Sequence, residues 1–265
     1  MLKFSIVTPT YMRIDNIKVF YAHLKKHTGN FQIEWIVVYE KDDVETFNYI
    51  SKIQDMKIVL IENNGIFSNA LKIGSENATG DFINFLGDDD YIINNAFQKI
   101  SDHINNDTTI DWIIGQGLYI NEEGKQIRKI ITFLKNILLF FYSKNTLIIV
   151  NYVMSPSSFC RKEILQKIKF FENYHWYGND YISWIRLSKI TKPLVLNFPI
   201  SKATYSSNTL SGSFNLKGYL MMLKMVKKES SNIFIMTLQT LVSVIIILYN
   251  FFNKILLKFL LKKKN

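Results

Sequence analysis

The sequence predicts an α/β protein with a mixed, mostly parallel sheet flanked by helices, followed by a helical tail that is apolar and basic. Three observations predict this class. Short apolar runs rich in β-branched residues alternate with helix-length segments through the first hundred residues. Polar clusters follow these runs, as expected where the strands of a parallel sheet end. Near the C-terminus, twenty uncharged residues (233–252) precede a segment in which lysines alternate with aliphatic residues and Phe.

The first half predicts four strands and three helices. The strands are continuous apolar runs, the first of them stopped by Pro9, and "NNG" and Gly80 bracket the third helix. Continuous apolar strands are typical of a parallel sheet buried on both faces, where ligands bind beyond the carboxyl ends. The predicted strands are 3–11, 34–40, 57–62 and 81–86, and the predicted helices are 16–27, 44–54 and 67–78.

The pattern changes from residue 111 onward. The segment 111–130 predicts a strand and a hairpin, with the turn near Glu123 and Gly124. The segment 131–154 is apolar for most of its length and predicts a core helix and strand, with a lipid-facing segment as the alternative. Short helices are predicted at 161–167 and 180–187, and a late strand at 193–199.

Composition bounds the class of protein. The chain has 265 residues, of which 48% are hydrophobic, so it can bury a large core and is not disordered. The single cysteine, Cys160, excludes a disulfide framework and a cysteine zinc cluster. The net charge of +10 favours anionic partners. Many lysines lie in the tail beside aliphatic residues, a pattern that favours an anionic lipid surface over nucleic acid.

The two ends of the chain predict its location. The N-terminus lacks the charged and apolar regions of a signal peptide, so we expect a cytosolic start. The uncharged run 233–252 is long enough to span a bilayer but is diluted by polar residues. We therefore expect the protein at the cytoplasmic face of the inner or plasma membrane, either peripheral or held by a single C-terminal anchor. The alternative is a helix packed on the domain or on a partner subunit.

The stretch "FINFLGDDDY" (82–91) places three adjacent aspartates at the end of the fourth predicted strand. Adjacent carboxylates repel each other, which raises at least one pKa unless a cation is present. Mg²⁺ or Mn²⁺ is typically held by one or two carboxylates together with substrate phosphate oxygens. Asp88, Asp89 and Asp90 are therefore candidate metal ligands, and Gly87 gives the backbone freedom to turn. The alternative is a solvated acidic turn.

Four motifs occur in an order that resembles a family 2 glycosyltransferase of the GT-A fold. They are "FSIVTPTYMR", "EWIVVYEKDD", "NNGIFSNALKIGSENATGDFINFLGDDDY" and "GNDYISWIRL". The resemblance covers residues 3–212 and implies a nucleotide-binding half (1–110) and an acceptor-binding half (111–212), followed by a membrane-associating tail (213–265). The D-x-D motif of the family begins at the position of Gly87, so its first acid is missing here.

The resemblance also implies roles for individual residues. Asp89 matches the metal-binding acid, with Asp88 and Asp90 beside it. Glu40 matches an acid that hydrogen-bonds the base, and Asp88 replaces the missing acid at the ribose or the metal. The implied nucleotide-binding residues are Thr8, Pro9, Tyr11, Arg13, Glu40, Asn64, Gly65, Asn69 and Asp88.

An acidic pair that opens a helix near the acceptor in the family corresponds here to Asn179 and Asp180. The resemblance implies that Asp180 is the catalytic base. A carboxylate at a helix N-terminus is stabilised as the anion and can accept a proton from an acceptor hydroxyl. The alternative is that Asp180 only caps the helix. Trp176 and Tyr177 are candidates for stacking on a sugar ring, and we group them with Asn179 as acceptor-binding residues.

Together these expectations describe an inverting, metal-dependent transferase. It would move a sugar from a nucleotide-diphosphate donor, with UDP favoured, to a glycan or lipid-linked acceptor in surface polysaccharide or lipooligosaccharide synthesis. Mn²⁺ or Mg²⁺ is the expected cofactor, nucleic acid is not an expected partner, and formation of a homo-oligomer stays open. A nucleotidyltransferase is disfavoured because "TPTYMRIDN" lacks the glycines of a phosphate loop. A non-catalytic, membrane-docked scaffold is the other alternative.

Overall fold

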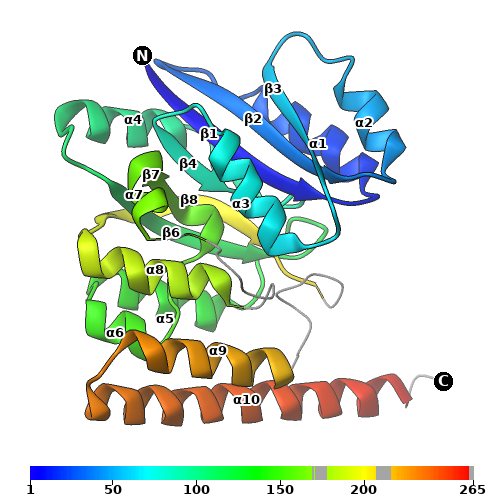
Figure 1. Ribbon diagram of the computed structural model, residues 1–265. Helices are drawn as coiled ribbons and strands as arrows, with labels where there is room; N and C mark the ends of the chain where they lie inside the picture. Colours follow the sequence, from blue (N-terminus) through cyan, green and yellow to red (C-terminus); the bar gives the residue numbers. More distant parts are fainter. Residues whose placement is uncertain (169, 171–177, 207–215, 263–265) are drawn as a thin grey trace.

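The computed structural model describes residues 1–168, 170, 178–206 and 216–262, with side chains up to residue 249. Eight strands form one sheet in the order β3-β2-β1-β4-β7-β6-β8-β5. The predicted class, a mixed and mostly parallel sheet flanked by helices, is confirmed (Figure 1). The strands are β1 (Leu2–Thr10), β2 (Phe31–Glu40), β3 (Lys57–Asn63), β4 (Phe82–Phe85), β5 (Tyr91–Ile92), β6 (Trp112–Ile120), β7 (Ser158–Arg161) and β8 (Leu194–Thr204).

Most strands of the sheet end at the same edge. Strands β1 to β4 are parallel to one another. Strand β7 is antiparallel to both β4 and β6, so β6 runs in the direction of β4, and β8 is parallel to β6. We call the edge at which β1, β2, β3, β4, β6 and β8 end the carboxyl edge. Ligands of open α/β sheets bind at such an edge.

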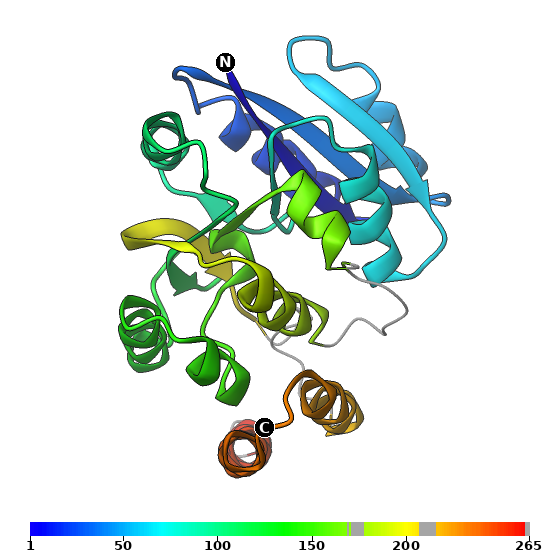
Figure 2. The same cartoon turned by 60° about the vertical axis from the view of Figure 1, so that its left-hand side comes forward.

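Helices cover both faces of the sheet and enclose two apolar cores (Figure 2). Adjacent strand residues enter different cores: Ile6 belongs to the core that α1, α2 and α4 line, and Val7 belongs to the core that α3 and α5 to α10 line. Burial on both faces explains why the strands are continuous apolar runs. The helices are α1 (Ile14–Leu24), α2 (Val44–Ile50), α3 (Phe67–Asn77), α4 (Ala96–Asn106), α5 (Lys129–Phe140), α6 (Lys144–Ile149), α7 (Lys162–Lys167), α8 (Asn179–Ile190), α9 (Leu216–Glu229) and α10 (Ile233–Lys262), with the 3₁₀ helix η1 (Ser155–Ser157).

Two details differ from the sequence-based expectations. Strand β1 continues through Pro9, which pairs in register with Val38 of β2. Strand β4 pairs with β1 only as far as Val7, so Pro9 has a strand partner on one side, an edge-like position that tolerates proline. The segment 131–154 forms helices α5 and α6 and contains no strand. The expected turn near Gly124 is confirmed, and it is closed by a single antiparallel bridge between Ile120 and Gln126.

The described part of the tail packs on the domain as two helices. Helix α9 lies against α8, where Glu229 pairs with Arg186 at 2.9 Å and with Lys189 at 2.6 Å. A β-carbon at Gly178, just before α8, would lie 2.7 Å from Met222 Cγ on α9. Helix α10 lies against α9 and α6 and buries Ile235. The helix that carries Asp180 therefore rests directly on the tail.

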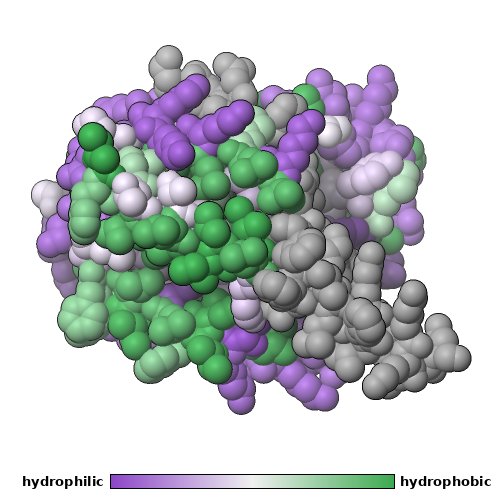
Figure 3. Space-filling view, turned by 90° about the horizontal axis from the view of Figure 1, so that it is seen from below, coloured by the Kyte–Doolittle hydropathy of each residue, from purple (hydrophilic) through white to green (hydrophobic). Residues whose placement is uncertain are grey.

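The tail and α5 also expose many apolar side chains. Figure 3 shows hydrophobic residues over much of the described surface on the side where α10 lies. Among the described residues, no helix combines the length and apolarity needed to cross a bilayer. The exposed apolar residues are Ile130, Phe133, Leu134, Ile137, Phe140 and Phe141 in or next to α5, and Ile233, Phe234, Leu241, Val244, Ile245, Leu248 and Tyr249 in α10.

Candidate active site

Arg13 joins two of the three aspartates at the carboxyl edge. Its guanidinium lies 2.8 Å from Asp88 Oδ1 and 2.9 Å from Asp89 Oδ2. The hydroxyl of Thr10, the last residue of β1, donates a hydrogen bond of 2.7 Å to Asp88 Oδ2. The ends of β1 and β4 are thus joined by ion pairs, and Arg13, predicted as a nucleotide-binding residue, contacts the acidic run, which the sequence analysis did not predict.

The other members of the run are placed differently. Asp90 accepts a 2.9 Å hydrogen bond from the Thr204 backbone N–H at the end of β8, and the Thr204 hydroxyl donates to the Asp89 carbonyl. Burial, and then the charge of Asp89, raises the pKa of Asp90 well above its usual value. Burial also raises the pKa of Asp88 to about 6, although the Arg13 guanidinium acts in the opposite direction. The run therefore lacks full charge compensation.

The loop between β1 and α1 is held by acids that the sequence analysis did not select. The Tyr11 hydroxyl donates to Asp42 at 2.9 Å, and the Met12 N–H donates to Asp43 at 2.6 Å. Met12 has a φ of 51°, a left-handed conformation that is costly for a residue with a side chain. Asp42 and Asp43 belong to the quoted "EWIVVYEKDD" motif. The sequence therefore contained these acids in a selected motif but gave no indication of their hydrogen-bond partners.

Glu40 organises the loop after β3. Its carboxylate accepts hydrogen bonds from Asn63 Nδ2 at 2.7 Å and from the Gly65 N–H. Asn69 Nδ2 donates to Asn63 Oδ1 at 2.9 Å and makes a longer contact of 3.4 Å with Asn64 Oδ1. The predicted residues Glu40, Asn64, Gly65 and Asn69 thus lie in one cluster. Its central amide belongs to Asn63, which the sequence analysis missed.

Two predicted nucleotide-binding residues have other surroundings. Thr8 is fully buried, and its hydroxyl accepts a 3.0 Å hydrogen bond from Trp35 Nε1. Pro9 lies within the pairing of β1 with β2. The side chain of Thr8 therefore helps to join strand β1 to β2 and does not reach the surface of the carboxyl edge.

Asp180 lies in the first turn of α8. Its Oδ2 accepts a 2.9 Å hydrogen bond from the Ser155 hydroxyl, and its Oδ1 accepts one of 2.7 Å from the Tyr181 N–H. Ser155 opens η1, which contacts β4, β5 and β8, the strands that flank the acidic run. Asn179 is buried beside it, while Trp176 and Tyr177 lie outside the described residues. Asp180 is thus connected to the surroundings of the aspartates through η1.

The implied Mn²⁺ or Mg²⁺ can be tested against these residues. Within the described part of the chain, no group of three His, Cys, Asp or Glu side chains could hold a metal by itself. The Asp89 side chain is 18% exposed, whereas Asp88 is buried, and both Asp88 and Asp90 are hydrogen-bonded within the protein. A β-carbon at Gly87 would lie 3.1 Å from Asp89 Oδ1, so glycine keeps space open beside that oxygen. The residues fit a cation held by one carboxylate and completed by substrate phosphates.

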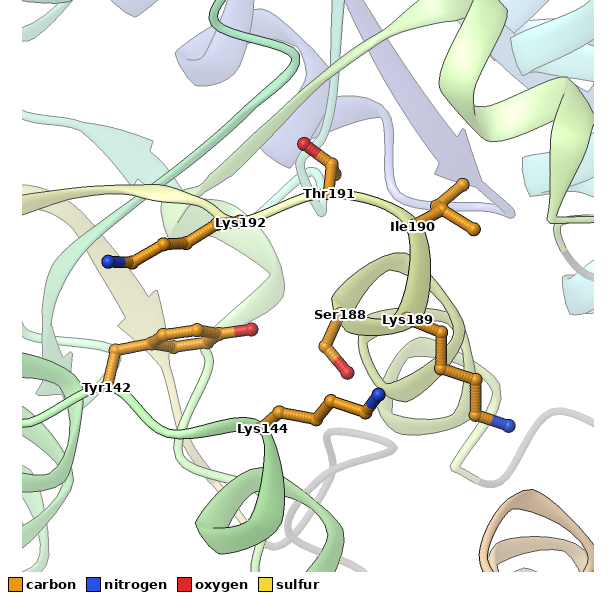
Figure 4. A pocket seen from close by; sticks show the side chains of 7 residues that line it. All are labelled: Tyr142, Lys144, Ser188, Lys189, Ile190, Thr191 and Lys192. Atoms are coloured by element: carbon orange, nitrogen blue, oxygen red, sulfur yellow. The ribbon is translucent and has the colours of Figure 1, made fainter.

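A separate pocket lies near the opposite edge of the sheet, just before β8 begins. It has a volume of about 380 Å³, and in Figure 4 the Tyr142 and Ser188 hydroxyls and the Lys144 ammonium point toward one another. It shares no residue with the acidic run or with the surroundings of Asp180. The lining residues are Tyr142, Lys144, Ser188, Lys189, Ile190, Thr191 and Lys192.

The sheet order and the acidic site at its carboxyl edge define the GT-A class of fold. Similar folds are found in crystal structures of S. aureus TarS 1–349. The complex with UDP-GlcNAc has a TM-score of 0.67 and 18% identity, and the match covers 86% of this chain and 66% of that one. The complex with UDP has a TM-score of 0.66 and 17% identity, with 86% and 65% covered. This chain thus spans slightly under two thirds of those fragments.

The sequence comparison identifies the family. The model of glycosyl transferase family 2 matches residues 5–169, which include β1 to β4 and the acidic run. The chain therefore belongs to glycosyl transferase family 2. No curated protein matches the sequence. The resemblance inferred from the four motifs is confirmed for the family and for the fold.

Proposed function

We propose that this protein transfers a sugar from a nucleotide-diphosphate donor, UDP-linked, to a hydroxyl of a glycan or lipid-linked acceptor. The observation that carries the proposal is the paired arrangement of Arg13, Asp88 and Asp89 at the carboxyl edge of a family 2 chain. The similar TarS structures hold UDP-GlcNAc and UDP, which supports a UDP-linked donor. A surface polysaccharide or lipooligosaccharide pathway would supply such acceptors.

The donor half of the site would use the Asn64–Gly65 turn, which the protein holds in place, and the guanidinium of Arg13, which can change partners. Glu40 and Asn63 hold the Asn64–Gly65 turn, which we assign to the nucleoside. Arg13 is 44% exposed on its side chain and can leave Asp89 to meet a diphosphate. Asp89 would hold Mn²⁺ or Mg²⁺, which when bound neutralises charge on a diphosphate leaving group. Asp88 and Asp90 would keep Asp89 in place.

The acceptor half would depend on Asp180. The Ser155 hydroxyl and the Tyr181 N–H both donate to its carboxylate, and these two hydrogen bonds fix its orientation. One carboxylate oxygen would take the proton of the acceptor hydroxyl as that oxygen attacks the anomeric carbon. Attack on the face opposite the diphosphate inverts the anomeric centre. The leaving diphosphate keeps the electron pair of the broken bond.

The first test measures release of the nucleoside diphosphate from a panel of nucleotide sugars, with Mn²⁺ or with EDTA. We expect UDP release from one UDP-sugar and a loss of about 100-fold or more for Asp89→Asn. Asp15→Asn is the matched control, because Asp15 is an exposed carboxylate on α1 that pairs with Lys18 of the same helix at 3.4 Å. Equal activity of Asp89→Asn and the wild type would contradict the metal role, and no release from any donor by the folded protein would contradict the transferase.

We also propose that α10 and α5 rest on an anionic membrane at its cytoplasmic face. Both helices expose apolar side chains, and Lys254, Lys258 and 262–264 follow in the tail sequence. Apolar residues combined with lysines suit an interfacial helix on anionic lipid. A lipid-linked acceptor would be presented at the same surface.

Sedimentation with vesicles tests the membrane proposal. The full chain should bind vesicles that contain phosphatidylglycerol and bind pure phosphatidylcholine vesicles about tenfold more weakly, since each basic residue near the surface contributes about 1 kcal/mol. Phe133→Ser combined with Phe141→Ser should weaken binding. Val19→Ser on α1, also an exposed apolar residue, should not. Binding that is unchanged by the α5 substitutions would remove α5 from the proposal, and equal binding to both vesicles would contradict it.

A further inference from the structure

The guanidinium of Arg128 lies beside two tyrosine rings near the carboxyl edge. Its guanidinium carbon lies 4.1 Å from the centre of the Tyr205 ring and 5.1 Å from that of Tyr119. The two rings meet edge to face, 5.9 Å apart. A planar guanidinium that stacks on aromatic faces keeps its N–H donors directed outward in its own plane. The arrangement therefore orients a cation without consuming its hydrogen-bond donors.

The position of this cluster follows from the strand directions. Tyr119 is next to the last residue of β6, and Tyr205 directly follows β8. Both strands end at the carboxyl edge, and Thr204, the residue before Tyr205, contacts Asp89 and Asp90. Arg128 thus lies at the same edge as the acidic run. Along the sheet order it is on the side away from Glu40, beyond β4.

Arg128 differs from every other arginine of the chain. Arg13 pairs with two aspartates, Arg161 with Asp111, and Arg186 with Glu229. In the described part of the chain, no carboxylate forms an ion pair with Arg128. Its backbone is left-handed, with φ 49°, a conformation that is unfavourable for a residue with a side chain. A strained residue that holds an uncompensated cation beside a substrate edge is a candidate anion site.

We propose that Arg128, held beside the rings of Tyr119 and Tyr205, binds a phosphate group carried by the acceptor. A phosphate accepts paired N–H bonds from a guanidinium, and such charge-assisted bonds are strong. The acceptor is favoured over the donor because the nucleoside side of the edge is at Glu40, the diphosphate side is at Arg13 and Asp89, and Arg128 lies beyond both. The assignment to the acceptor rests on the proposed transferase function.

The test uses glucose 6-phosphate as a phosphate-bearing probe, glucose as its neutral counterpart, and UDP for the donor, with binding to the full chain measured by ligand-observed NMR. The wild type should bind glucose 6-phosphate more tightly than glucose. Arg128→Gln should weaken glucose 6-phosphate about tenfold or more, since a charged hydrogen bond contributes about 1.5 to 3 kcal/mol. Its affinity for UDP should stay within about twofold of the wild type. The affinity of Arg128→Lys for glucose 6-phosphate should lie between those of the wild type and Arg128→Gln, because lysine keeps the charge and lacks the planar guanidinium.

The controls separate this proposal from the transferase itself. Lys125→Gln removes a cation from the same hairpin, one already paired with Glu123 at 2.9 Å, and should bind like the wild type. Thermal unfolding checks that each variant is folded. Unchanged binding of glucose 6-phosphate by Arg128→Gln, or a loss of UDP affinity in its place, would overturn the assignment to the acceptor. Failure of the wild type to bind UDP would contradict the proposed donor, while the glucose 6-phosphate comparison still decides the role of Arg128.

Discussion

Two buried carboxylates, those of Glu34 and Asp88, lie near opposite ends of the parallel strands, and their surroundings differ. Near the start of β2, Glu34 accepts hydrogen bonds from the Ser5 hydroxyl at 2.6 Å and from the Thr79 N–H at 2.8 Å, and pairs with Lys57 at 2.5 Å. Burial acts to raise the pKa of Glu34, but these partners lower it to about 2. At the carboxyl edge, burial raises the pKa of Asp88 to about 6 despite Arg13.

The difference separates a structural carboxylate from those for which we propose a function. Each Glu34 oxygen has partners from the protein, so the charge contributes to stability and has no capacity left for a ligand. The aspartate run has three adjacent acids and a single arginine against two of them. The run therefore has an excess of negative charge, which a bound cation or a positively charged transition state would balance.

The largest expected effect is on catalysis at the carboxyl edge. Asp180→Asn should lower kcat by about 10²- to 10⁴-fold, because a general base contributes that much and an amide cannot accept the proton. The KM for the donor should change little. Ser155→Ala should give a smaller loss, since it removes one hydrogen bond to Asp180 and leaves the base. A steady-state comparison of the three proteins tests this, and an Asp180→Asn enzyme with normal kcat would make Asp180 only a helix cap.

At Glu34 we expect a loss of stability without a loss of activity. Glu34→Gln should lower the free energy of unfolding by about 3 kcal/mol, which is the shift from 4.5 to about 2 at roughly 1.4 kcal/mol per pKa unit. At a temperature where the variant stays folded, its kcat should match the wild type. Urea unfolding and an activity assay measure the two quantities. A catalytic loss without a loss of stability would reverse the assignment of the two regions.

The pH dependence of stability sharpens the same contrast. The folded pKa of Glu34 is lower than its ordinary value, so the stabilisation is present above about pH 4.5 and is lost as the pH falls toward 2. The wild type should lose about 3 kcal/mol more than Glu34→Gln over this window. Chemical unfolding at pH 5, 4 and 3 provides the comparison. Parallel curves for the two proteins would be inconsistent with a depressed pKa.

The smallest effect is expected for the partner of Glu34. The Lys57 side chain is 52% exposed, so its ion pair is partly screened by water. Lys57→Met should cost about 1 kcal/mol, because Ser5 and Thr79 still hold the buried carboxylate. The measurement is again urea unfolding. A cost equal to that of Glu34→Gln would mean that Lys57 alone compensates the charge.

The strands with long apolar runs could be predicted from the sequence, and the very short ones could not. β1 to β4 carry continuous apolar residues because both faces are covered, and the aspartate run follows from the end of β4. β4 has only four residues but lies in the apolar run 82–86, whereas β7, also of four residues, begins with Ser158 and ends with Arg161, and β5 has two residues, too few to show any periodicity. Helix α4 was also missed, although Phe97, Ile100 and Ile104 are spaced for one buried face.

The sequence predicted which residues form the candidate site but not which residues they contact. The acids near β2 and β4 were evident, whereas the contact of Arg13 with Asp88 joins residues 75 positions apart, and no local pattern records it. Asn63, not Asn64, occupies the centre of the Glu40 cluster because β3 extends one residue further than the apolar run suggests. The pairing of the α8 cations with Glu229 likewise depends on a tail that lies far along the chain.

The contact of α8 with α9 gives the tail a geometric role. Helix α8 begins at Asn179, directly after Gly178, where no β-carbon fits beside Met222, and two cations farther along α8 are fastened to Glu229. Helix α10 in turn lies against α9. If α10 lies on a surface, these contacts fix the distance between Asp180 and that surface. The tail would then act as a spacer. It would set how far an acceptor hydroxyl must extend from that surface to reach Asp180.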